Sequence, residues 1–251
     1  MTEKVPLKKR SDTVKVSLKK SGVTKEKVTL RVGCALDISG SMQGNFASGR
    51  VSDLVDRLLP VADQFDDNGE IDMWAFNTSS RELPPATPAN YGGYVEKELR
   101  GLNINGGTNY APVIEDIAHH YFGKEDVLVS KEEKPTGFFG KLFGQTKTVS
   151  TYETRAVTES EIPALVFFIS DGEASDTGAT DRLMTQLRDE KVYWVMIGIG
   201  AANQFRFMQL LADQYENVGF INFKSLDLTD EQIYDSIING ELANWINKVS
   251  K

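Results

Sequence analysis

Two stretches of the sequence are almost wholly apolar: residues 162–170, IPALVFFIS, and residues 192–200, VYWVMIGIG. A strand without polar alternation needs cover on both faces, and a segment with helical spacing of apolar residues follows each stretch. This alternation is typical of a parallel sheet with helices on both sides. Each stretch has about half of the roughly 20 residues that a membrane-spanning helix needs, so neither predicts a membrane segment.

The rest of the chain continues this alternation, and it predicts a Rossmann-like, doubly wound α/β fold with a mostly parallel sheet flanked by helices. Further strands are predicted at residues 27–36, 70–76 and 218–223, with an edge strand at the prolines of 81–85. Helices are predicted at residues 51–65, 109–122, 181–190, 205–214 and 229–249, the last broken near Gly240. The tryptophans at 74 and 194 fall in strands and are expected in the core.

The length of 251 residues suits one large α/β domain or two small ones, and a chain that is 40% hydrophobic and 25% charged can bury a sizeable core. The single cysteine, Cys34, excludes an intrachain disulfide. The charged N-terminus lacks the apolar core of a secretion signal, so the expected location is cytoplasmic.

Charge is distributed unevenly along the chain. Residues 1–31 hold ten Lys or Arg against three acids, whereas the remainder holds 18 against 33. Residues 1–27 are therefore predicted to be a basic tail ahead of a domain at 28–251. The tail could bind an anionic partner or fold back on the acidic body, but a solvated tail or an added edge strand at TVKVSLKK, residues 13–20, is the preferred interpretation. It has no aromatic residue for base stacking, and the body is acidic, so nucleic acid is not an expected partner.

Small oxygen-bearing side chains follow the predicted strands. In LDISGSM, Asp37, Ser39 and Ser41 come directly after the first buried strand. Thr108 precedes a helix in NGGTNYAP, and Asp171 ends a central strand in FFISDGE. In a doubly wound sheet the binding site lies beyond the carboxyl ends of the strands, so these five side chains are expected to meet there.

Two carboxylates and three hydroxyls are hard donors, which suit Mg²⁺ and, as alternatives, Mn²⁺ or Ca²⁺. With no histidine or thiol nearby, zinc and copper are poor candidates. Such a set would leave a coordination position for an anion, and we expect an Asp or Glu of a protein partner to fill it. The helix N-termini after Ser41 and Thr108 would favour that anion. Nearby Glu173 could tune the charge or simply be solvated.

An enzyme is the alternative. A Mg²⁺-dependent phosphotransferase or phosphatase could use Asp37 as nucleophile, with Asp171 as a later acid. Such enzymes normally place a second aspartate two positions on as general acid, where this chain has Ser39, so the non-enzymatic interpretation is preferred.

The motif resembles the metal-ion-dependent adhesion site of von Willebrand factor A domains. All five ligand positions of that family have counterparts here: Asp37, Ser39, Ser41, Thr108 and Asp171. The resemblance implies direct ligation by the serines, direct or water-mediated ligation by the threonine, and mostly water-mediated contacts from the aspartates. The chain around VTLRVGCALDISGSM and GLNINGGTNYAPVI is similar to the A-type domains of bacterial tellurium-resistance TerF-like proteins. This implies a non-enzymatic interaction module in a stress or tellurium-resistance system.

The connection at residues 123–160 is far longer than usual between a helix and a strand. EDVLVS and KTVSTYETRAV, on either side of GFFGKLFGQ, could pair as a β-hairpin with an apolar tip. We expect an inserted loop or hairpin here, at the end of the sheet opposite the metal. The apolar tip would either pack on itself or offer a second partner surface.

Overall fold

The computed structural model describes residues 5–23, 28–66, 68–133, 147–156 and 162–249. Within these ranges the chain divides into two compact units, residues 1–117 with 161–251, and residues 118–160. The first holds the six-stranded sheet and every predicted metal ligand.

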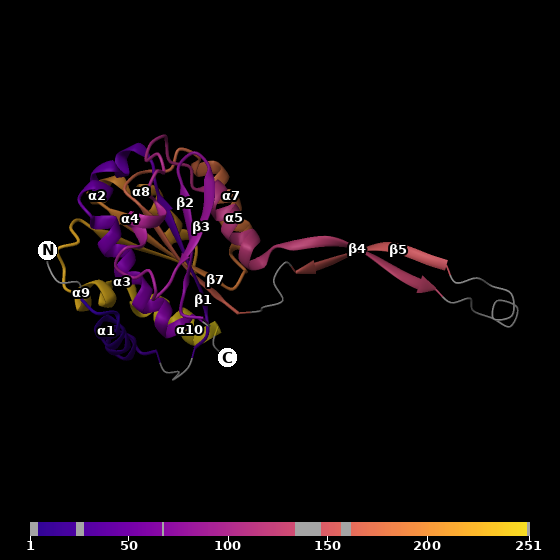
Figure 1. The fold of residues 1–251 in the computed structure, drawn as a ribbon, viewed down its shortest axis with the longest axis horizontal. Helices are drawn as coiled ribbons and strands as arrows, with labels where there is room; N and C mark the ends of the chain where they lie inside the picture. The colour runs from indigo at the N-terminus through magenta and orange to yellow at the C-terminus, as the bar shows by residue number, and fades with distance from the viewer. Residues whose placement is uncertain (1–4, 24–27, 67, 134–146, 157–161, 250–251) are drawn as a thin grey trace, which may run out of the picture. The chain divides into compact units, whose positions relative to one another are not determined.

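The central sheet has the strand order β3-β2-β1-β6-β7-β8 (Figure 1). Its strands are β1 (Arg31–Asp37), β2 (Ile71–Phe76), β3 (Ser80–Ala86), β6 (Ala164–Ser170), β7 (Val192–Ile199) and β8 (Val218–Phe223). All neighbours pair in parallel except β2 and β3, which are antiparallel. The predicted doubly wound sheet with one antiparallel edge is therefore confirmed.

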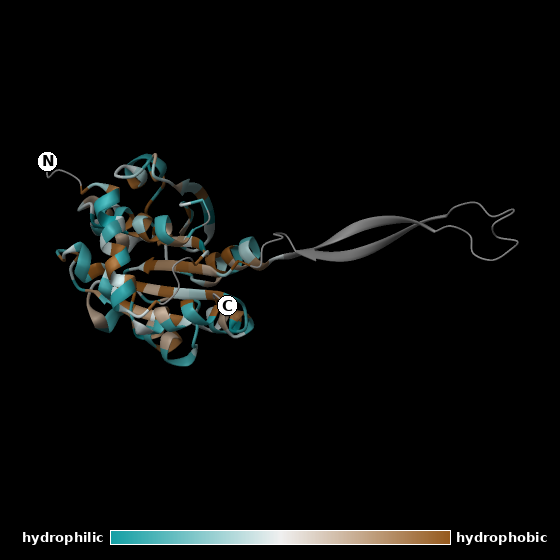
Figure 2. Ribbon diagram, turned by 90° about the horizontal axis from the view of Figure 1, so that it is seen from below, coloured by the Kyte–Doolittle hydropathy of each residue, from teal (hydrophilic) through white to brown (hydrophobic). Residues whose placement is uncertain are grey.

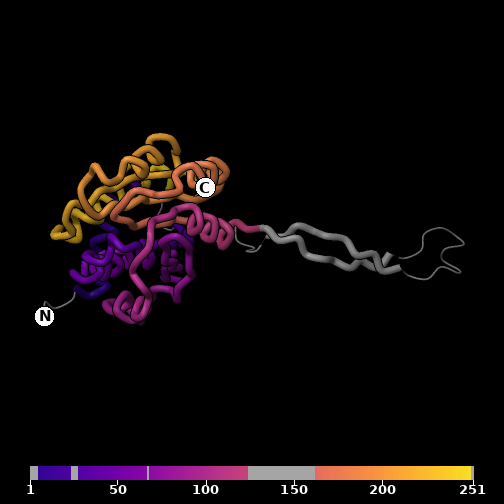
Figure 3. Tube along the Cα trace, turned by 90° about the horizontal axis from the view of Figure 1, so that it is seen from above, coloured from indigo at the N-terminus to yellow at the C-terminus, as the bar shows by residue number. Residues whose placement is uncertain are grey.

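Successive elements fill the two halves of the sheet separately. Figure 3 shows the N-terminal part of the chain, indigo to magenta, in one half and the C-terminal part, orange to yellow, in the other. The halves meet where β1 pairs with β6, in register from Arg31↔Ala164 to Leu36↔Ile169. Strand order reverses at this point, and in doubly wound sheets such a reversal opens a crevice beyond the strand ends.

Helices cover both faces of the sheet. α3 (Arg50–Phe65), α4 (Tyr94–Glu98), α9 (Asp230–Ile237) and α10 (Gly240–Val249) pack with alternate strand residues in one core. α5 (Ala111–Phe122) and α7 (Thr177–Leu187) lie on the other face. Trp74 and Trp194 are buried, as expected.

Figure 2 shows hydrophobic strands inside a shell of helices with hydrophilic outer faces. The shorter segments are η1 (Gly40–Met42), α2 (Gln43–Ala47), η2 (Ala202–Gln204) and α8 (Arg206–Gln214).

The last predicted helix is broken as expected. α9 ends at Ile237 and α10 begins at Gly240. Between them the Asn239 side chain accepts hydrogen bonds from the backbone N–H groups of Glu241 and Leu242, both at 3.0 Å. Asparagine is among the preferred residues at a helix start, and it explains why a new helix begins here.

The predicted edge strand at residues 13–20 is wrong, because this segment belongs to helix α1, Leu7–Lys20. The buried positions of α1 recur at helical spacing, but most are polar: Arg10, Ser11, Val14 and Ser17. Hydrophobic periodicity detects apolar residues only, so a buried helix face built from arginine and serine gives no helical signal.

Ion pairs hold α1 on the body. Arg10 pairs with Asp53 of α3 (3.4 Å) and Asp230 of α9 (3.1 Å). Arg57 of α3 pairs with the same two carboxylates, at 3.0 and 3.2 Å. The result is a closed ring of two arginines and two aspartates across three helices. The basic segment therefore folds back on the acidic body, and the preferred prediction of a solvated tail or an edge strand is wrong.

The second unit contains the predicted hairpin. β4 (Lys124–Glu133) and β5 (Lys147–Ala156) pair antiparallel over their full length, from Lys124↔Ala156 to Glu133↔Lys147. The predicted apolar tip, residues 137–145, lies outside the described residues.

Candidate metal centre

The predicted ligands gather at the carboxyl ends of the two central strands. Asp37 is the last residue of β1, and Asp171 follows the last residue of β6. Asp37 and Ser39 are buried, Asp171 is half-buried and Ser41 is exposed. The site therefore begins under the loops and opens to solvent at Ser41.

A chain of hydrogen bonds connects four of the five residues. The Ser39 N–H donates to Asp37 Oδ1 at 2.7 Å, and the Ser39 and Ser41 hydroxyl oxygens lie 3.1 Å apart. The Ser41 hydroxyl donates to Asp171 Oδ1 at 2.7 Å. The two carboxylates are thus linked across 134 positions of sequence through two serines of one turn.

The fifth residue, Thr108, is held beside this chain by its backbone. Its carbonyl accepts a hydrogen bond from Ser175 N (2.7 Å), in the loop that follows Asp171. Two residues earlier, Gly106 accepts one from Gly40 N (3.1 Å), in the turn between the serines. Gly106 has φ +86°, which a side chain would strain. The Thr108 hydroxyl forms no hydrogen bond with another described residue.

Both carboxylates sit in an environment that disfavours negative charge. Burial raises the pKa of Asp37, hydrogen bonds from Ser170 and Ser39 oppose that shift, and the charge of Asp171 adds to it. Burial likewise raises the pKa of Asp171, against hydrogen bonds from Ser41 and Asn45. Neither carboxylate forms an ion pair with a described lysine or arginine. A bound cation would offset this cost of burying negative charge.

The donor set fits a hard divalent cation. Adjacent oxygens in an octahedron with Mg–O bonds near 2.1 Å lie about 3.0 Å apart, and the Ser39 and Ser41 hydroxyls lie 3.1 Å apart. Larger Ca²⁺ would space them more widely. Among the described residues there is no cluster of three His, Cys, Asp or Glu side chains fit for a metal. The candidate site therefore depends on hydroxyls for three of its five ligands.

Two supporting residues were missed by sequence reasoning. Ser170 is fully buried, and its hydroxyl donates to Asp37 Oδ2 at 2.5 Å. Asn45 donates to Asp171 Oδ2 at 3.2 Å. Ser170 was weakly indicated by the sequence, because it is the single hydroxyl residue at the end of an otherwise apolar strand. Nothing in the spacing marked Asn45.

The N-terminus of α5 does not favour an incoming anion as expected, because Asp176 already occupies it. This carboxylate accepts hydrogen bonds from Tyr110 N and Ala111 N, both at 2.9 Å, at the start of α5. The anion at this helix N-terminus is therefore a side chain of the chain itself. Ser41 lies in a single 3₁₀ turn, Gly40–Met42, followed by the five-residue α2, so little helix field arises there.

Glu173 is exposed, as expected of a loop acid, but its carboxylate is bonded to another element. Its carboxylate accepts hydrogen bonds from Arg206 N (2.5 Å) and Phe207 N (3.1 Å), the first residues of α8. Glu173 thus fastens the loop after β6 to α8.

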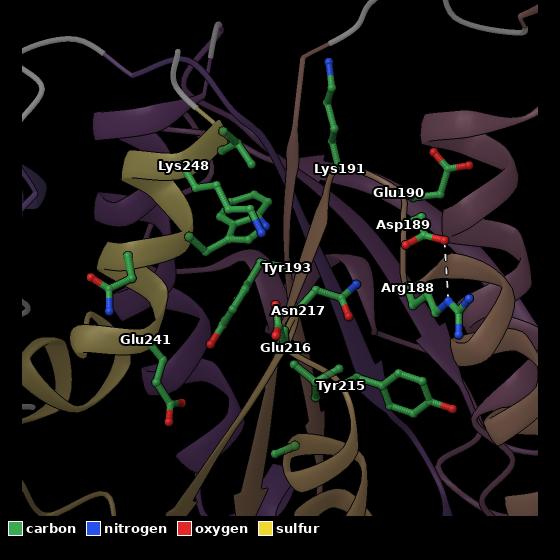
Figure 4. A pocket seen from close by; sticks show the side chains of 15 residues that line it. Arg188, Asp189, Glu190, Lys191, Tyr193, Tyr215, Glu216, Asn217, Glu241 and Lys248 are labelled. Carbon is green, nitrogen blue, oxygen red and sulfur yellow. Dashed lines mark hydrogen bonds and ion pairs between the residues drawn. The ribbon is translucent and has the colours of Figure 1, made fainter.

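A separate hollow of about 620 Å³ lies at the end of the sheet opposite the candidate metal centre, at the amino ends of β7 and β8 (Figure 4). Tyr193 stands at its centre, between α10 with Lys248 and the turn of Arg188–Lys191. It contains none of the predicted metal ligands, and its mixed charges indicate no single ligand class.

The fold and the rim of oxygen ligands define the class as a von Willebrand factor A domain. The model of the family vWA-TerF-like, described as "vWA found in TerF C terminus", matches residues 29–130 and 141–251. The chain belongs to this family. The similarity to TerF-like domains is thereby confirmed. As a class, von Willebrand factor A domains are generally interaction modules.

Other proteins share this fold. The uncharacterized protein YcbR of Bacillus subtilis (strain 168) is 29% identical over 255 residues, covering 98% of this chain and 88% of YcbR. Proximal thread matrix protein 1 of the mussel byssus matches with TM-score 0.54 and 15% identity over 84% of this chain. This chain spans 47% of the mussel protein, about half its length. Another structure of that protein has a zinc-occupied MIDAS motif.

The manganese-loaded TRAP protein of Plasmodium vivax matches with TM-score 0.52 and 14% identity, over 85% of this chain and 73% of TRAP. At such identities the likeness establishes the fold. Zinc and manganese have thus been found on this fold in other proteins. In the part of this chain that the structure describes, no helix is long and apolar enough to cross a bilayer.

Proposed function

We propose that this chain is a Mg²⁺-dependent protein interaction module of a bacterial stress or tellurium-resistance system, acting in the cytoplasm. Asp37, Ser39, Ser41, Thr108 and Asp171 would hold the metal, with Mn²⁺ and Ca²⁺ as alternatives. One observation carries the proposal: two carboxylates that form no ion pair with a described lysine or arginine are joined, at the exposed end of the central strands, through the Ser39 N–H and the hydroxyls of Ser39 and Ser41.

Each residue has a distinct role in this proposal. The hydroxyls of Ser39, Ser41 and Thr108 would contact the metal, and the carboxylates of Asp37 and Asp171 would balance its charge. When bound, the cation supplies a Lewis-acidic position for an anionic oxygen. Because Ser41 is exposed while Asp37 is buried, a partner's Asp or Glu would approach from the Ser41 side.

The environment of Asp37 supports a non-enzymatic role. Both of its oxygens accept short hydrogen bonds, from Ser39 N and the Ser170 hydroxyl, and the residue is fully buried. A nucleophile must reach its substrate, and a general acid would be needed two positions on, where Ser39 has no acidic proton to give.

Calorimetric titration of metal-stripped protein with Mg²⁺ tests the metal part of the proposal. Wild type should bind one equivalent saturably, and both Asp37→Ala and Thr108→Ala should lose that binding. Asp189→Ala, which alters an exposed carboxylate at the opposite edge of the sheet, is the matched control and should bind normally. Equal binding by wild type and both site variants would contradict the assignment.

Partner binding tests the interaction part. Proteins captured from bacterial lysate by the immobilised wild type in Mg²⁺ should be released by EDTA, and they should not be captured by Asp37→Ala. Capture of the same proteins by both forms, with and without metal, would contradict a metal-dependent interaction.

A further inference from the structure

A hollow of about 490 Å³ lies beside the candidate metal centre. Glu173, Asn203, Arg206, Phe207 and Leu210 line it. Its first lining residue stands only two positions after Asp171, which bounds the backbone distance between them at about 7 Å. The hollow therefore borders the rim on which a partner would bind.

Leu210 distinguishes this hollow from the rest of the surface. Its side chain is 54% exposed, and Val16 on α1, at 51%, is the other large hydrophobic residue that is exposed among the described residues. The neighbouring residues Phe207, Met208 and Leu211 of α8 are buried, so α8 is anchored in the core while Leu210 faces outward. An isolated exposed leucine is ordinary, but one that lines a hollow beside a binding rim suits an apolar contact.

Arg206 adds a positive charge to the same hollow. It is exposed, and its guanidinium forms no ion pair or hydrogen bond with any described residue. It stands one helical turn before Leu210, about 6 Å along the axis. Because the chain as a whole carries a formal charge of −8, it would repel an acidic partner over most of its surface. Beside the candidate metal centre a divalent cation would balance the charges of Asp37 and Asp171, and Arg206 balances the charge of Glu173 in the hollow, so an acidic segment would meet no net negative charge there.

Hydrogen bonds connect the hollow firmly to the candidate metal loop. The Glu173 carboxylate binds the N–H groups of Arg206 and Phe207, and the Tyr110 hydroxyl donates to Gly172 O at 2.6 Å. The Tyr110 and Phe207 rings lie 6.3 Å apart on the inner side. The hollow and Asp171 are thus parts of one supported surface.

We infer that this hollow selects the partner. The inference rests on the proposed function, and it specifies the segment that is bound: an extended acidic peptide. One carboxylate of this segment completes the metal shell, an apolar side chain two to four residues away covers Leu210, and a second acid beside it pairs with Arg206. An extended chain advances about 3.4 Å per residue, so a spacing of two to four residues would reach about 7–14 Å from the metal-bound carboxylate.

The test uses a library of random octapeptides displayed on phage, selected on the immobilised wild-type chain in Mg²⁺. Enriched peptides should carry an acid with an apolar residue two to four positions away, and their binding should require Mg²⁺. Leu210→Asn should weaken their binding at least threefold, and Arg206→Gln should weaken the peptides with a second acid. Val16→Asn and Arg182→Gln are the matched controls, and they should bind as wild type.

Calorimetry of Mg²⁺ alone separates this inference from the proposed function. Leu210→Asn should bind Mg²⁺ with the affinity of wild type, because Leu210 is not a candidate metal ligand. Since its side chain is exposed, the substitution should not disturb folding. If Mg²⁺-dependent peptides bind Leu210→Asn and wild type equally, the hollow does not select the partner. That result would not affect the assignment of the metal centre. A failure to enrich any Mg²⁺-dependent peptide with a chain that binds Mg²⁺ would also count against the hollow. Absence of Mg²⁺ binding in wild type would overturn the proposed function itself.

Discussion

At the scale of single residues, the candidate site depends on how buried carboxylates are satisfied. Asp37 has one oxygen on a backbone N–H and the other on the Ser170 hydroxyl. Ser170→Ala leaves a buried acceptor without its donor, and the free energy of unfolding should fall by about 1–3 kcal/mol in urea titrations. Ser236→Ala, which removes an exposed hydroxyl bonded to the Gln232 carbonyl, should change it little. Equal effects would contradict this role of Ser170.

A second residue-scale prediction concerns Asp176, which joins the Thr108 loop to the loop after β6. Asp176→Ala removes the acceptor of two N–H groups at the start of α5 and should cost about 1–2 kcal/mol of stability. Asp176→Asn keeps one acceptor oxygen and should cost less. Chemical denaturation of both variants measures the difference, and an alanine variant as stable as wild type would show that Asp176 is not needed there.

The meeting of the five candidate ligands at one rim could be predicted because spacing and strand ends are visible in a sequence. Ser170, Asn45 and Asp176 act through hydrogen bonds to residues 65–133 positions away, and no local pattern encodes such partners. The expected role of the α5 N-terminus failed for the same reason, since the capping side chain comes from another loop.

At the scale of elements, the sheet followed from the sequence and α1 did not. Strands such as IPALVFFIS can be recognised in the sequence, because a strand that is covered on both faces needs apolar residues at nearly every position. α1 buries Arg10 and Ser17, whose polar groups bind acids supplied by α3 and α9. Tertiary partners thus turn a segment with a strand-like alternation into a helix.

Arg10 makes this dependence testable. Arg10→Ala leaves Asp53 and Asp230 with Arg57 alone, and stability should fall by about 2 kcal/mol. The loss is smaller than for a fully buried pair because the Asp53 side chain is 41% exposed. Hydrogen exchange should show lost protection across residues 7–20. Lys15→Ala removes an exposed pair with Asp12 and should leave protection unchanged. Unaltered exchange in Arg10→Ala would mean that apolar contacts alone hold α1.

At the scale of the whole molecule, all candidate ligands lie in the unit that excludes residues 118–160. Replacing residues 124–156 with a short Gly-Ser linker should therefore preserve cooperative unfolding, with Tm within a few degrees of the full chain, and should preserve Mg²⁺ affinity. Thermal unfolding and calorimetry check this. A deletion variant that fails to fold would show that the hairpin supports the sheet.

The hairpin was predictable from the length and alternation of its segment, whereas the division into compact units depends on contacts that the sequence does not display.

The most direct test of the central claim is a crystal structure of the chain soaked with Mn²⁺, with anomalous scattering used to locate the ion. We predict a single strong peak bonded to the Ser39 and Ser41 hydroxyls, with Thr108 and the two carboxylates around it. A well-ordered crystal with no peak at these residues, or with its peak at another acidic surface, would contradict a metal centre at the ends of β1 and β6.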